Sequence, residues 1–245
     1  MRIRRLLALA LIGPVASACT ANPVFPDHDE ELVAEVTFSA EHLATLTEFT
    51  ITVHVEDDHG EHVTAMAEVR AEFRFHDTET WRAETLTLEG EEFTGTHMFM
   101  SSGEYDFRVI GIQLGQVEEF VLYEAAEHME VERIHVEVGD FIVEFETFPG
   151  HVHEGGEAAA RFWIMEAEAD PDGHHHMMAG LHAEIHVTDA NGAAMEHEAH
   201  EEEAGIYEAH HTFLEAGEAR FEIHFEGMDG AEHHAEFHVP VSHEH

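Results

Sequence analysis

The feature that most constrains the fold of this chain is a two-residue alternation of apolar and polar side chains. It runs through segments such as 49–55, 69–75 and 221–225, in which every second residue is Phe, Val, Ile or Ala. Successive side chains of a β-strand point to opposite faces, so this period gives each strand one apolar face. Turn-forming segments such as 189–192 separate the runs. Many short strands of this kind predict an all-β, antiparallel sandwich fold.

The alternating pattern occurs twice along the chain. A series of positions recurs at a constant offset of 114 residues, the spacing of His97 and His211. The matched pairs are Phe93 and Tyr207, His97 and His211, Phe99 and Phe213, Gly103 and Gly217, Glu104 and Glu218, Phe107 and Phe221, and Val109 and Ile223. Such self-similarity at a fixed period is the mark of an internal duplication.

Two further matches extend the repeat towards its beginning. Residues 69–75 match 181–187 at an offset of 112. His42 and Glu48 match His151 and Glu157 at an offset of 109. The sequence therefore predicts two tandem β-sandwich domains. Their predicted ranges are 31–125 and 135–239, with an acidic connector over 126–134 and a His/Glu tail over 240–245.

Several motifs in the second unit carry a resemblance to a known family. They are Phe148-Pro149-Gly150, the turn Asp189-Ala190-Asn191-Gly192, the segment Gly205-Ile206-Tyr207-Glu208-Ala209, and Leu214-Glu215-Ala216-Gly217 before an alternating strand. With these motifs the second unit, and more faintly the first, resembles the YtkA-like, or FixH-family, extracytoplasmic domain of bacteria. The resemblance implies an immunoglobulin-like sandwich in each unit and an association with copper or other heavy-metal handling. Where the family has a Met/His cluster, this chain offers His186, Met195 and His197 instead.

The N-terminal residues are typical of an export signal. A basic start over 1–5 precedes an apolar run over 6–15 and then Ala16-Ser17-Ala18-Cys19. The apolar run is shorter than the roughly 20 residues that span a bilayer, which indicates a signal peptide over 1–18. The cleavage site resembles the lipobox of bacterial lipoproteins, although Ala16 stands in place of the usual Leu. That resemblance implies a lipidated Cys19 and a tether over 19–30. The alternative is an ordinary signal peptide followed by a chance cysteine.

The residue after Cys19 and the cysteine count add two expectations. Thr20 is not the aspartate linked with inner-membrane retention, so the resemblance to lipoproteins implies an outer-membrane anchor facing the periplasm. Because Cys19 is the only cysteine, no disulfide can form within the chain, and the core alone must hold the fold.

The charge balance restricts the partners of the protein. The chain has 53 acidic residues against 10 basic ones, a formal net charge of −43, and it contains no lysine. Such a surface repels the phosphates of nucleic acids and attracts cations. Histidine is abundant, with 26 residues, and imidazole is a common ligand of transition metals. The alternative is that histidines fill a solvated acidic surface in a chain that avoids lysine.

Three segments of the second unit are candidates for binding a copper or zinc ion. Imidazole nitrogens and thioether sulfurs suit these metals. The candidate ligands are His174, His175, His176, Met177 and Met178 in one loop, His151 and His153 on a strand, and His197 and His200 after Met195. A helical turn would bring His197 and His200 together. We expect a metal site to be specific to the second unit. Its three segments could meet at one end of the sandwich, which the sequence alone does not decide.

Other histidines lie within predicted strands. Those in 182–186, 222–224 and 234–238 alternate with core residues and therefore face outward beside glutamates, as a solvated acidic face or as weak cation sites. His97 and His211 are in phase with Phe99 and Phe213. These two are predicted to be buried and hydrogen-bonded.

The sequence predicts a periplasm-facing lipoprotein that binds copper or zinc ions for buffering, delivery or resistance. A metal-transport or efflux protein would be its partner, and the lipid anchor its contact with the membrane. The alternative is a non-metal structural or protein-binding tandem module with a solvated His/Glu-rich surface. We expect no enzymatic activity. The only cysteine lies at the predicted lipidation site, and phosphate-binding glycine motifs are absent.

The first prediction concerns the mature N-terminus. We expect the exported protein to begin at a lipidated Cys19, because small residues precede this cysteine directly after a short apolar run. Mass spectrometry of the N-terminal peptide from the membrane fraction should find acyl chains on Cys19. A free and unmodified N-terminus at another residue would remove the lipid anchor.

Overall fold

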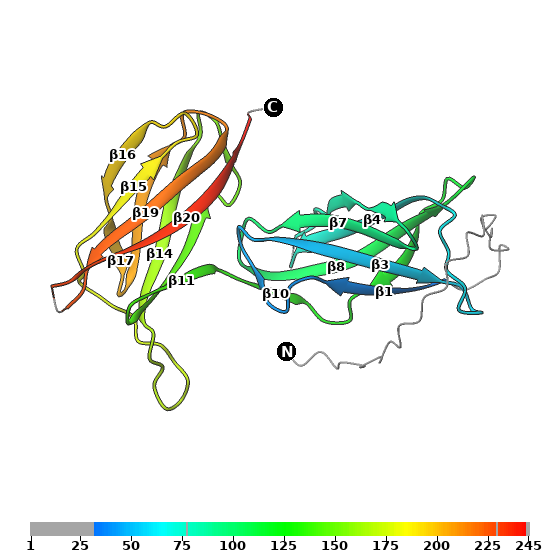
Figure 1. Cartoon of the computed structure of the whole chain (residues 1–245), viewed down its shortest axis with the longest axis horizontal. Coiled ribbons are helices and arrows are strands. Elements are labelled where there is room, and N and C mark those ends of the chain that lie inside the picture. The colour runs from blue at the N-terminus through cyan, green and yellow to red at the C-terminus, as the bar shows by residue number, and fades with distance from the viewer. Residues whose placement is uncertain (1–31, 77, 229, 244–245) are drawn as a thin grey trace, which may run out of the picture.

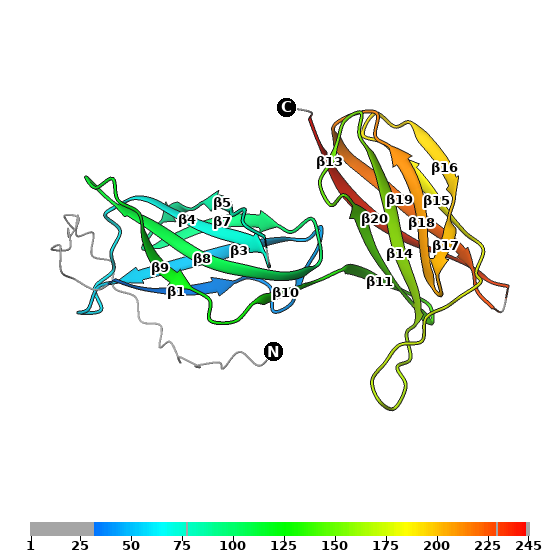
Figure 2. The ribbon, with the colours of Figure 1, turned by 180° about the vertical axis from the view of Figure 1, so that it is seen from behind.

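A computed structural model describes residues 32–76, 78–228 and 230–243, and these fold as β-strands, turns and loops (Figures 1 and 2). The prediction of an all-β fold is confirmed. Among these residues no helix has the length and apolar character that a membrane span requires. The predicted signal peptide (1–18), Cys19 and the tether (19–30) lie outside the described residues.

The first ten strands form one sandwich of two sheets. One sheet has the order β1-β3-β7-β6, and the other has the order β2-β10-β8-β4-β5, with β9 also paired to β8. The strands are β1 (Val33–Phe38), β2 (Leu43–Ala44), β3 (Glu48–Glu56), β4 (Met66–Phe75), β5 (Arg82–Thr85), β6 (Thr87–Glu89), β7 (Glu92–Met98), β8 (Gly103–Gln113), β9 (Phe120–Glu124) and β10 (Met129–Glu132).

The last ten strands form a second sandwich. Its sheets have the orders β11-β12-β14-β18-β17 and β13-β20-β19-β15-β16. The strands are β11 (Ile134–Val138), β12 (Phe141–Phe148), β13 (Val152–His153), β14 (Glu157–Glu166), β15 (Ala183–Thr188), β16 (Ala194–Glu198), β17 (His200–Glu203), β18 (Ile206–Thr212), β19 (Gly217–Glu226) and β20 (Glu232–Ser242).

The two sandwiches share one strand plan. The order β3-β7-β6 corresponds to β14-β18-β17, and the order β2-β10-β8-β4-β5 corresponds to β13-β20-β19-β15-β16. In each sandwich a two-residue strand pairs in parallel with the last strand, β2 with β10 and β13 with β20. Gly103 and Gly217, which the repeat matches, begin β8 and β19. The chain is therefore a tandem pair of immunoglobulin-like β-sandwiches.

The offset of 112 residues predicted for the central strand is wrong by two residues. β4 pairs with β8 so that Glu72 lies opposite Arg108, and β15 pairs with β19 so that His186 lies opposite Glu222. Because β8 and β19 match at an offset of 114, β4 and β15 match at 114 as well. A two-residue slip leaves every side chain on its original face, so alternation alone cannot detect it.

Two segments predicted to lie outside the domains contain strand residues. β10 lies within the predicted connector 126–134 and pairs with β8. β20 runs to Ser242, into the predicted tail 240–245, whose last two residues lie outside the described ones. Both segments are rich in Glu and His because only their inward positions need to be apolar. Val131 and Val241 fill these positions and are buried.

Each sandwich encloses its own hydrophobic core. In the second core the ring of Phe145 stacks on that of Phe237 with centroids 4.8 Å apart, and it packs at 5.2 Å from Phe221. In the first core Phe49 stacks on Phe99 at 5.4 Å. Burying one such side chain contributes about 1.5–3 kcal/mol, so a few aromatic residues from facing sheets supply much of the stability.

The second prediction concerns Tyr207, which is fully buried in β18. Its hydroxyl donates to the Met178 carbonyl at 2.8 Å and accepts from the Leu181 amide at 3.0 Å. Tyr207→Phe should lower the free energy of unfolding by about 1–3 kcal/mol, because it leaves both backbone groups without this partner. Denaturant titration measures this. Tyr105→Phe is the control, since the Tyr105 hydroxyl makes one bond, to Ser101 O, in a half-buried site and should cost less. Equal stability of Tyr207→Phe and the wild type would contradict the prediction.

Candidate functional site

The loop between β14 and β15 carries His174, His175 and His176 but does not gather their rings. Backbone hydrogen bonds from Asp170 N to His174 O (2.8 Å) and from Glu166 N to His176 O (2.9 Å) hold it as an extended arm, which projects from the second sandwich in Figure 1. Successive side chains of an extended segment point in opposite directions. His175 donates through Nδ1 to the Glu166 carbonyl at 2.9 Å, whereas His174 and His176 are exposed.

The two methionines that follow have different surroundings. Met178 is buried and belongs to the second hydrophobic core. Met177 is 37% exposed, and its backbone forms a bridge with Met165. The thioether of Met178 therefore packs in the core and does not join the loop histidines.

His151 and His153 lie at the opposite end of the second sandwich. β13 pairs with the last residues of β20 and precedes β14, whereas the histidine loop follows β14. The ten residues of β14 span about 30 Å. His151 contacts Arg82 of the first sandwich, and His153 Nδ1 lies 2.7 Å from the Ser242 hydroxyl. The structure therefore does not bring the candidate segments together at one end of the sandwich.

His197 and His200 do not lie on a helical turn, the arrangement that would have brought them together. His197 lies on β16 and His200 on β17, and these strands belong to different sheets. Both are edge strands, in which polar residues alternate. β16 pairs with β15 and β17 pairs with β18, and these inner strands supply the apolar residues of the core. His200 is exposed opposite Glu208.

His197 takes part in a buried chain of three polar side chains. His211 Nε2 donates to Asp189 Oδ1 at 2.9 Å, which leaves His211 Nδ1 to accept from His197 Nε2 at 3.0 Å. Asp189 Oδ2 also accepts from the Leu214 amide at 3.1 Å. The His211 side chain is 1% exposed. The prediction that His211 is buried and hydrogen-bonded is confirmed, and its partners account for both ring nitrogens.

His97 occupies the corresponding position in the first sandwich. Its ring stacks on Phe73 at 4.3 Å, and its Nδ1 lies 3.0 Å from Glu84 Oε1. Burial lowers the pKa of His97 below its usual value, although the hydrogen bond to Glu84 opposes this shift. The prediction of a hydrogen-bonded histidine is confirmed here too, and the His97 side chain, which is 11% exposed, is less completely buried than that of His211.

Three groups of imidazoles and carboxylates bring one ligand atom per residue within 4.8 Å of one another among the described residues. They are His54, Glu56 and His62; His76, Asp106 and His128; and Glu184, His186 and Glu196. Two of the three lie in the first sandwich, so the clustering of histidines in the sequence did not reveal where donor atoms converge. For the first and third groups, the signal that could have found them is the His-x-Glu or Glu-x-His spacing on a strand, which places both side chains on one face. The second group comes from three separate segments and has no such local signal.

The first two groups differ in how well a cation would fit. His54 Nε2 lies 3.1 Å from Glu56 Oε1, and the His54 and His62 rings lie 4.4 Å apart. The second group includes Asp106, which already accepts from the Arg74 guanidinium at 2.9 Å and 2.5 Å. This positive charge neutralises the carboxylate and disfavours a metal ion at that place.

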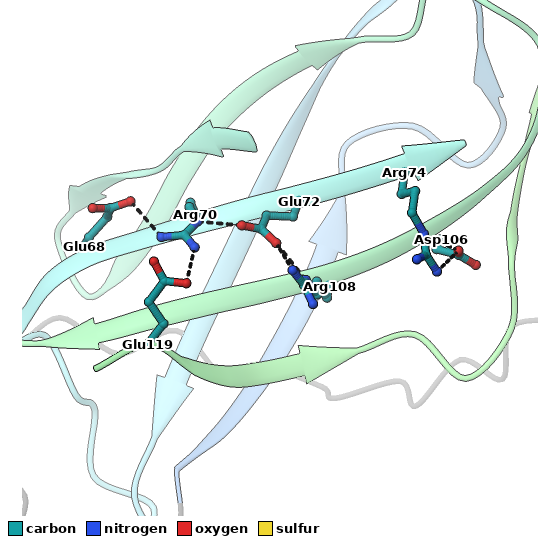
Figure 3. Close-up of polar contacts among 7 residues, drawn as sticks. All are labelled: Glu68, Arg70, Glu72, Arg74, Asp106, Arg108 and Glu119. Carbon is teal, nitrogen blue, oxygen red and sulfur yellow. Dashed lines mark hydrogen bonds and ion pairs between the residues drawn. The ribbon is translucent and has the colours of Figure 1, made fainter. Parts of the chain in front are cut away.

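The outer face of the first sandwich is a network of arginines and carboxylates (Figure 3). Arg70 contacts Glu72 at 2.6 Å, Glu119 at 2.7 Å and Glu68 at 3.2 Å. Arg108 contacts the second carboxylate oxygen of Glu72 at 2.6 Å. Burial would raise the pKa of Glu72, but the hydrogen bonds from both arginines outweigh it and lower the pKa. A guanidinium is charged at any physiological pH, so the positive half of these ion pairs is permanent.

The corresponding face of the second sandwich carries Arg220, which pairs with Glu222 at 3.2 Å and Glu236 at 3.5 Å, together with a row of histidines. His186, His224 and His234 follow one another across β15, β19 and β20, with ring centroids 4.3 Å and 6.1 Å apart. Glu184 lies directly opposite His224, and Glu196 lies opposite His186. The sequence prediction that these strand residues face outward is confirmed.

No protein-family model matches the sequence, and no curated protein matches it. Among solved structures, the Escherichia coli adhesin FdeC is 18% identical over 85% of this chain, with a TM-score of 0.33. Fibronectin(III)-like modules of Clostridium thermocellum CbhA are 13% identical over 86% of this chain and 97% of their own, with a TM-score of 0.28. The FN1–FN3 domains of chicken CNTN1 are 13% identical over 85% of this chain, with a TM-score of 0.31. The chain spans 63% of the adhesin structure and 66% of the CNTN1 structure.

The third prediction follows from the environment of His97. The pKa of His97 is lowered in the folded state. In the unfolded chain its pKa has the ordinary value of about 6.5, so the unfolded chain takes up a proton at His97 more readily than the folded protein does. This site therefore contributes stability at pH 7.5 that is lost as the pH falls below about 6.5. We expect the stability advantage of the wild type over His97→Gln to shrink between pH 7.5 and pH 5.5 in denaturant titrations. His200→Gln, at an exposed position, is the control. An advantage that stays constant over this range would contradict the prediction.

Proposed function

We propose that this protein is a non-catalytic module of the bacterial cell envelope that acts through its outer surfaces, as a structural or protein-binding element. Its two immunoglobulin-like sandwiches would be held in a fixed relative orientation. The observation that carries this proposal is the junction between the sandwiches, which is formed by specific side chains from both. A flexible linker would make few such contacts.

Leu46 is the central residue of this junction. It lies in the turn between β2 and β3, and its side chain packs against the hydrophobic core of the second sandwich. Its backbone has a φ of 56°, a conformation that costs a leucine about 1–2 kcal/mol. The matching residue of the second sandwich, at the offset of 109, is Gly155 with a φ of 75°. A leucine at a position suited to glycine is consistent with a side chain retained for its contact across the junction.

Hydrogen bonds and close packing surround Leu46. The amide of Ile134 donates to the Thr45 hydroxyl oxygen at 3.0 Å. The Ser102 amide and hydroxyl donate to the two carboxylate oxygens of Glu146 at 3.1 Å and 3.2 Å. Gly150 lies so close to the Met100 carbonyl that a Cβ would overlap it. These contacts support one relative orientation.

Arg133, directly after β10, adds a further contact at the start of the second sandwich. Its guanidinium lies 3.9 Å from the centroid of the Trp163 ring and pairs with Glu144 at 3.1 Å and Glu146 at 3.4 Å. Cation–π stacking and paired charges restrain this side chain. The segment between the sandwiches is therefore attached to the face that it crosses.

The proposal includes the location predicted from the sequence. An exported chain lipidated at Cys19 would present both sandwiches on the periplasmic side of the outer membrane. The acidic surface would repel anionic lipid headgroups, so the acyl chains would be the contact with the membrane.

Binding of copper or zinc ions, for buffering or delivery, is the second candidate function. The observation that favours it is the convergence of imidazole and carboxylate atoms in the three groups described above. It is also consistent with the resemblance to YtkA-like domains. A metal-transport or efflux protein would then be the partner.

The fourth prediction tests the fixed orientation. Leu46→Gly relieves the backbone strain of this turn but removes the side chain that reaches the second core. The wild-type sandwiches should share one alignment tensor in residual dipolar coupling measurements, whereas those of Leu46→Gly should differ. Leu114→Gly, at a leucine 52% exposed, is the control and should behave as the wild type. In cells, crosslinked adducts in which one partner is joined to both sandwiches should be lost in Leu46→Gly. The same adducts should remain in the wild type and in Leu114→Gly. Different tensors for the wild-type sandwiches would contradict the proposal.

A further inference from the structure

The outer face of β15, β16 and β19 has two imidazole nitrogens that form no hydrogen bond within the part of the chain that the structure describes. Nε2 of His186 and Nε2 of His224 are both buried and lack a hydrogen-bond partner among the described residues. Buried polar atoms are nearly always hydrogen-bonded, and an exception calls for an explanation such as an absent ion. A merely solvated histidine would expose this atom to water.

Two carboxylates lie around His186 at a distance that suits a metal ion. His186 Nε2 is 3.8 Å from Glu184 Oε2 and 3.8 Å from Glu196 Oε2. These separations are longer than a hydrogen bond. Two ligand atoms each about 2.1 Å from a tetrahedral zinc ion lie about 3.4 Å apart, so small side-chain movements would complete such a site.

The strand pairing fixes these side chains on one face. Glu184 and His186 are two residues apart on β15, and Glu196 lies opposite His186 on the edge strand β16. His224 lies opposite Glu184 on β19, and its ring stacks on His186 with centroids 4.3 Å apart. The three converging side chains therefore come from two paired strands, and His224 on the third strand lies directly beside them.

The corresponding face of the first sandwich carries arginines that pair with its carboxylates. With the offset of 114, Glu184 takes the position of Arg70, whose guanidinium contacts three carboxylates. Within the described part of the chain, Glu184 and Glu196 form no ion pair with an arginine. At the same offset His186 takes the position of Glu72, so the second sandwich has a carboxylate where the first has its central guanidinium and an imidazole where the first has Glu72. The negative charge of Glu184 and Glu196 can be offset by a bound cation.

We propose that Glu184, His186 and Glu196 bind one borderline divalent transition-metal ion, such as zinc, with His224 as an additional donor. Nitrogen and oxygen donors of this kind are those that zinc takes in proteins. The site deepens the second candidate function and does not depend on a fixed orientation of the sandwiches. It differs from the sequence-predicted ligands His174, His175 and His176, which lie on the loop after β14.

The fifth prediction tests this site with zinc and the metal-free full-length protein. Calorimetric titration should show that His186→Ala weakens the tightest zinc site at least tenfold. Glu184→Arg, which introduces the guanidinium found at the matching position of the first sandwich, should abolish that site. His200→Ala, at an exposed histidine of the other sheet, should bind as the wild type does. Thermal unfolding checks that each variant is folded, and His186→Asn serves as a second variant of the same position.

Nitrogen NMR of the imidazoles identifies which residues bind. The first equivalent of zinc should shift the ring signals of His186 and His224 before those of the loop histidines. Tight binding by the wild type that His186→Ala and Glu184→Arg leave unchanged would overturn this site alone. Loss of zinc binding in the triple variant His174→Ala, His175→Ala, His176→Ala, with His186→Ala unaffected, would also overturn this site alone. A wild-type chain that does not bind zinc would overturn both the site and metal binding as a function.

Discussion

In both sandwiches, aromatic side chains from facing sheets pack against one another in a core that no disulfide within the chain reinforces. Phe145 stacks on Phe237 in one core and Phe49 on Phe99 in the other. Because inward strand positions alone supply this burial, the outward positions are free to carry other chemistry. Most of the 53 acidic residues and many of the 26 histidines can therefore lie on the surface without weakening the core.

Carboxylates on such a surface repel one another, and the two sandwiches offset this repulsion in different ways. In the first, Arg70 and Arg108 pair with carboxylates at distances of 2.6–3.2 Å and neutralise them at any physiological pH. In the second, the corresponding face carries His186 and His224. Arg220 pairs with Glu222 and Glu236 on this face, whereas Glu184 and Glu196 pair with no arginine among the described residues. A proton on a neighbouring imidazole or a bound cation would offset their charge. The same fold thus carries a network of arginine–carboxylate pairs in the first sandwich and, around Glu184 in the second, imidazole and carboxylate donors that no arginine pairs with among the described residues.

The junction gives the pair a second property that a single sandwich lacks. Leu46 packs against the core of the neighbouring sandwich, and the guanidinium of Arg133 lies over the Trp163 ring. Two rigid bodies joined in this way present both outer faces in a fixed relation, which suits either an element that spans a distance or one that contacts a partner at two places. Metal binding on the second face would be compatible with either role, because Glu184 and His186 lie on β15 and Glu196 on β16, away from the residues that form the junction.

The sequence by itself determined the all-β class, the tandem repeat and the burial of His97 and His211, because alternation reports directly which side of a strand each residue occupies. It could not determine the register, since an offset of 112 and one of 114 place the same side chains on the same faces. Nor could it show which histidines converge. Consecutive residues His174, His175 and His176 diverge along an extended arm, whereas Glu184, His186 and Glu196 come from two strands that only the sheet brings together. Convergence depends on cross-strand pairing between distant segments, and only the tertiary structure decides that pairing.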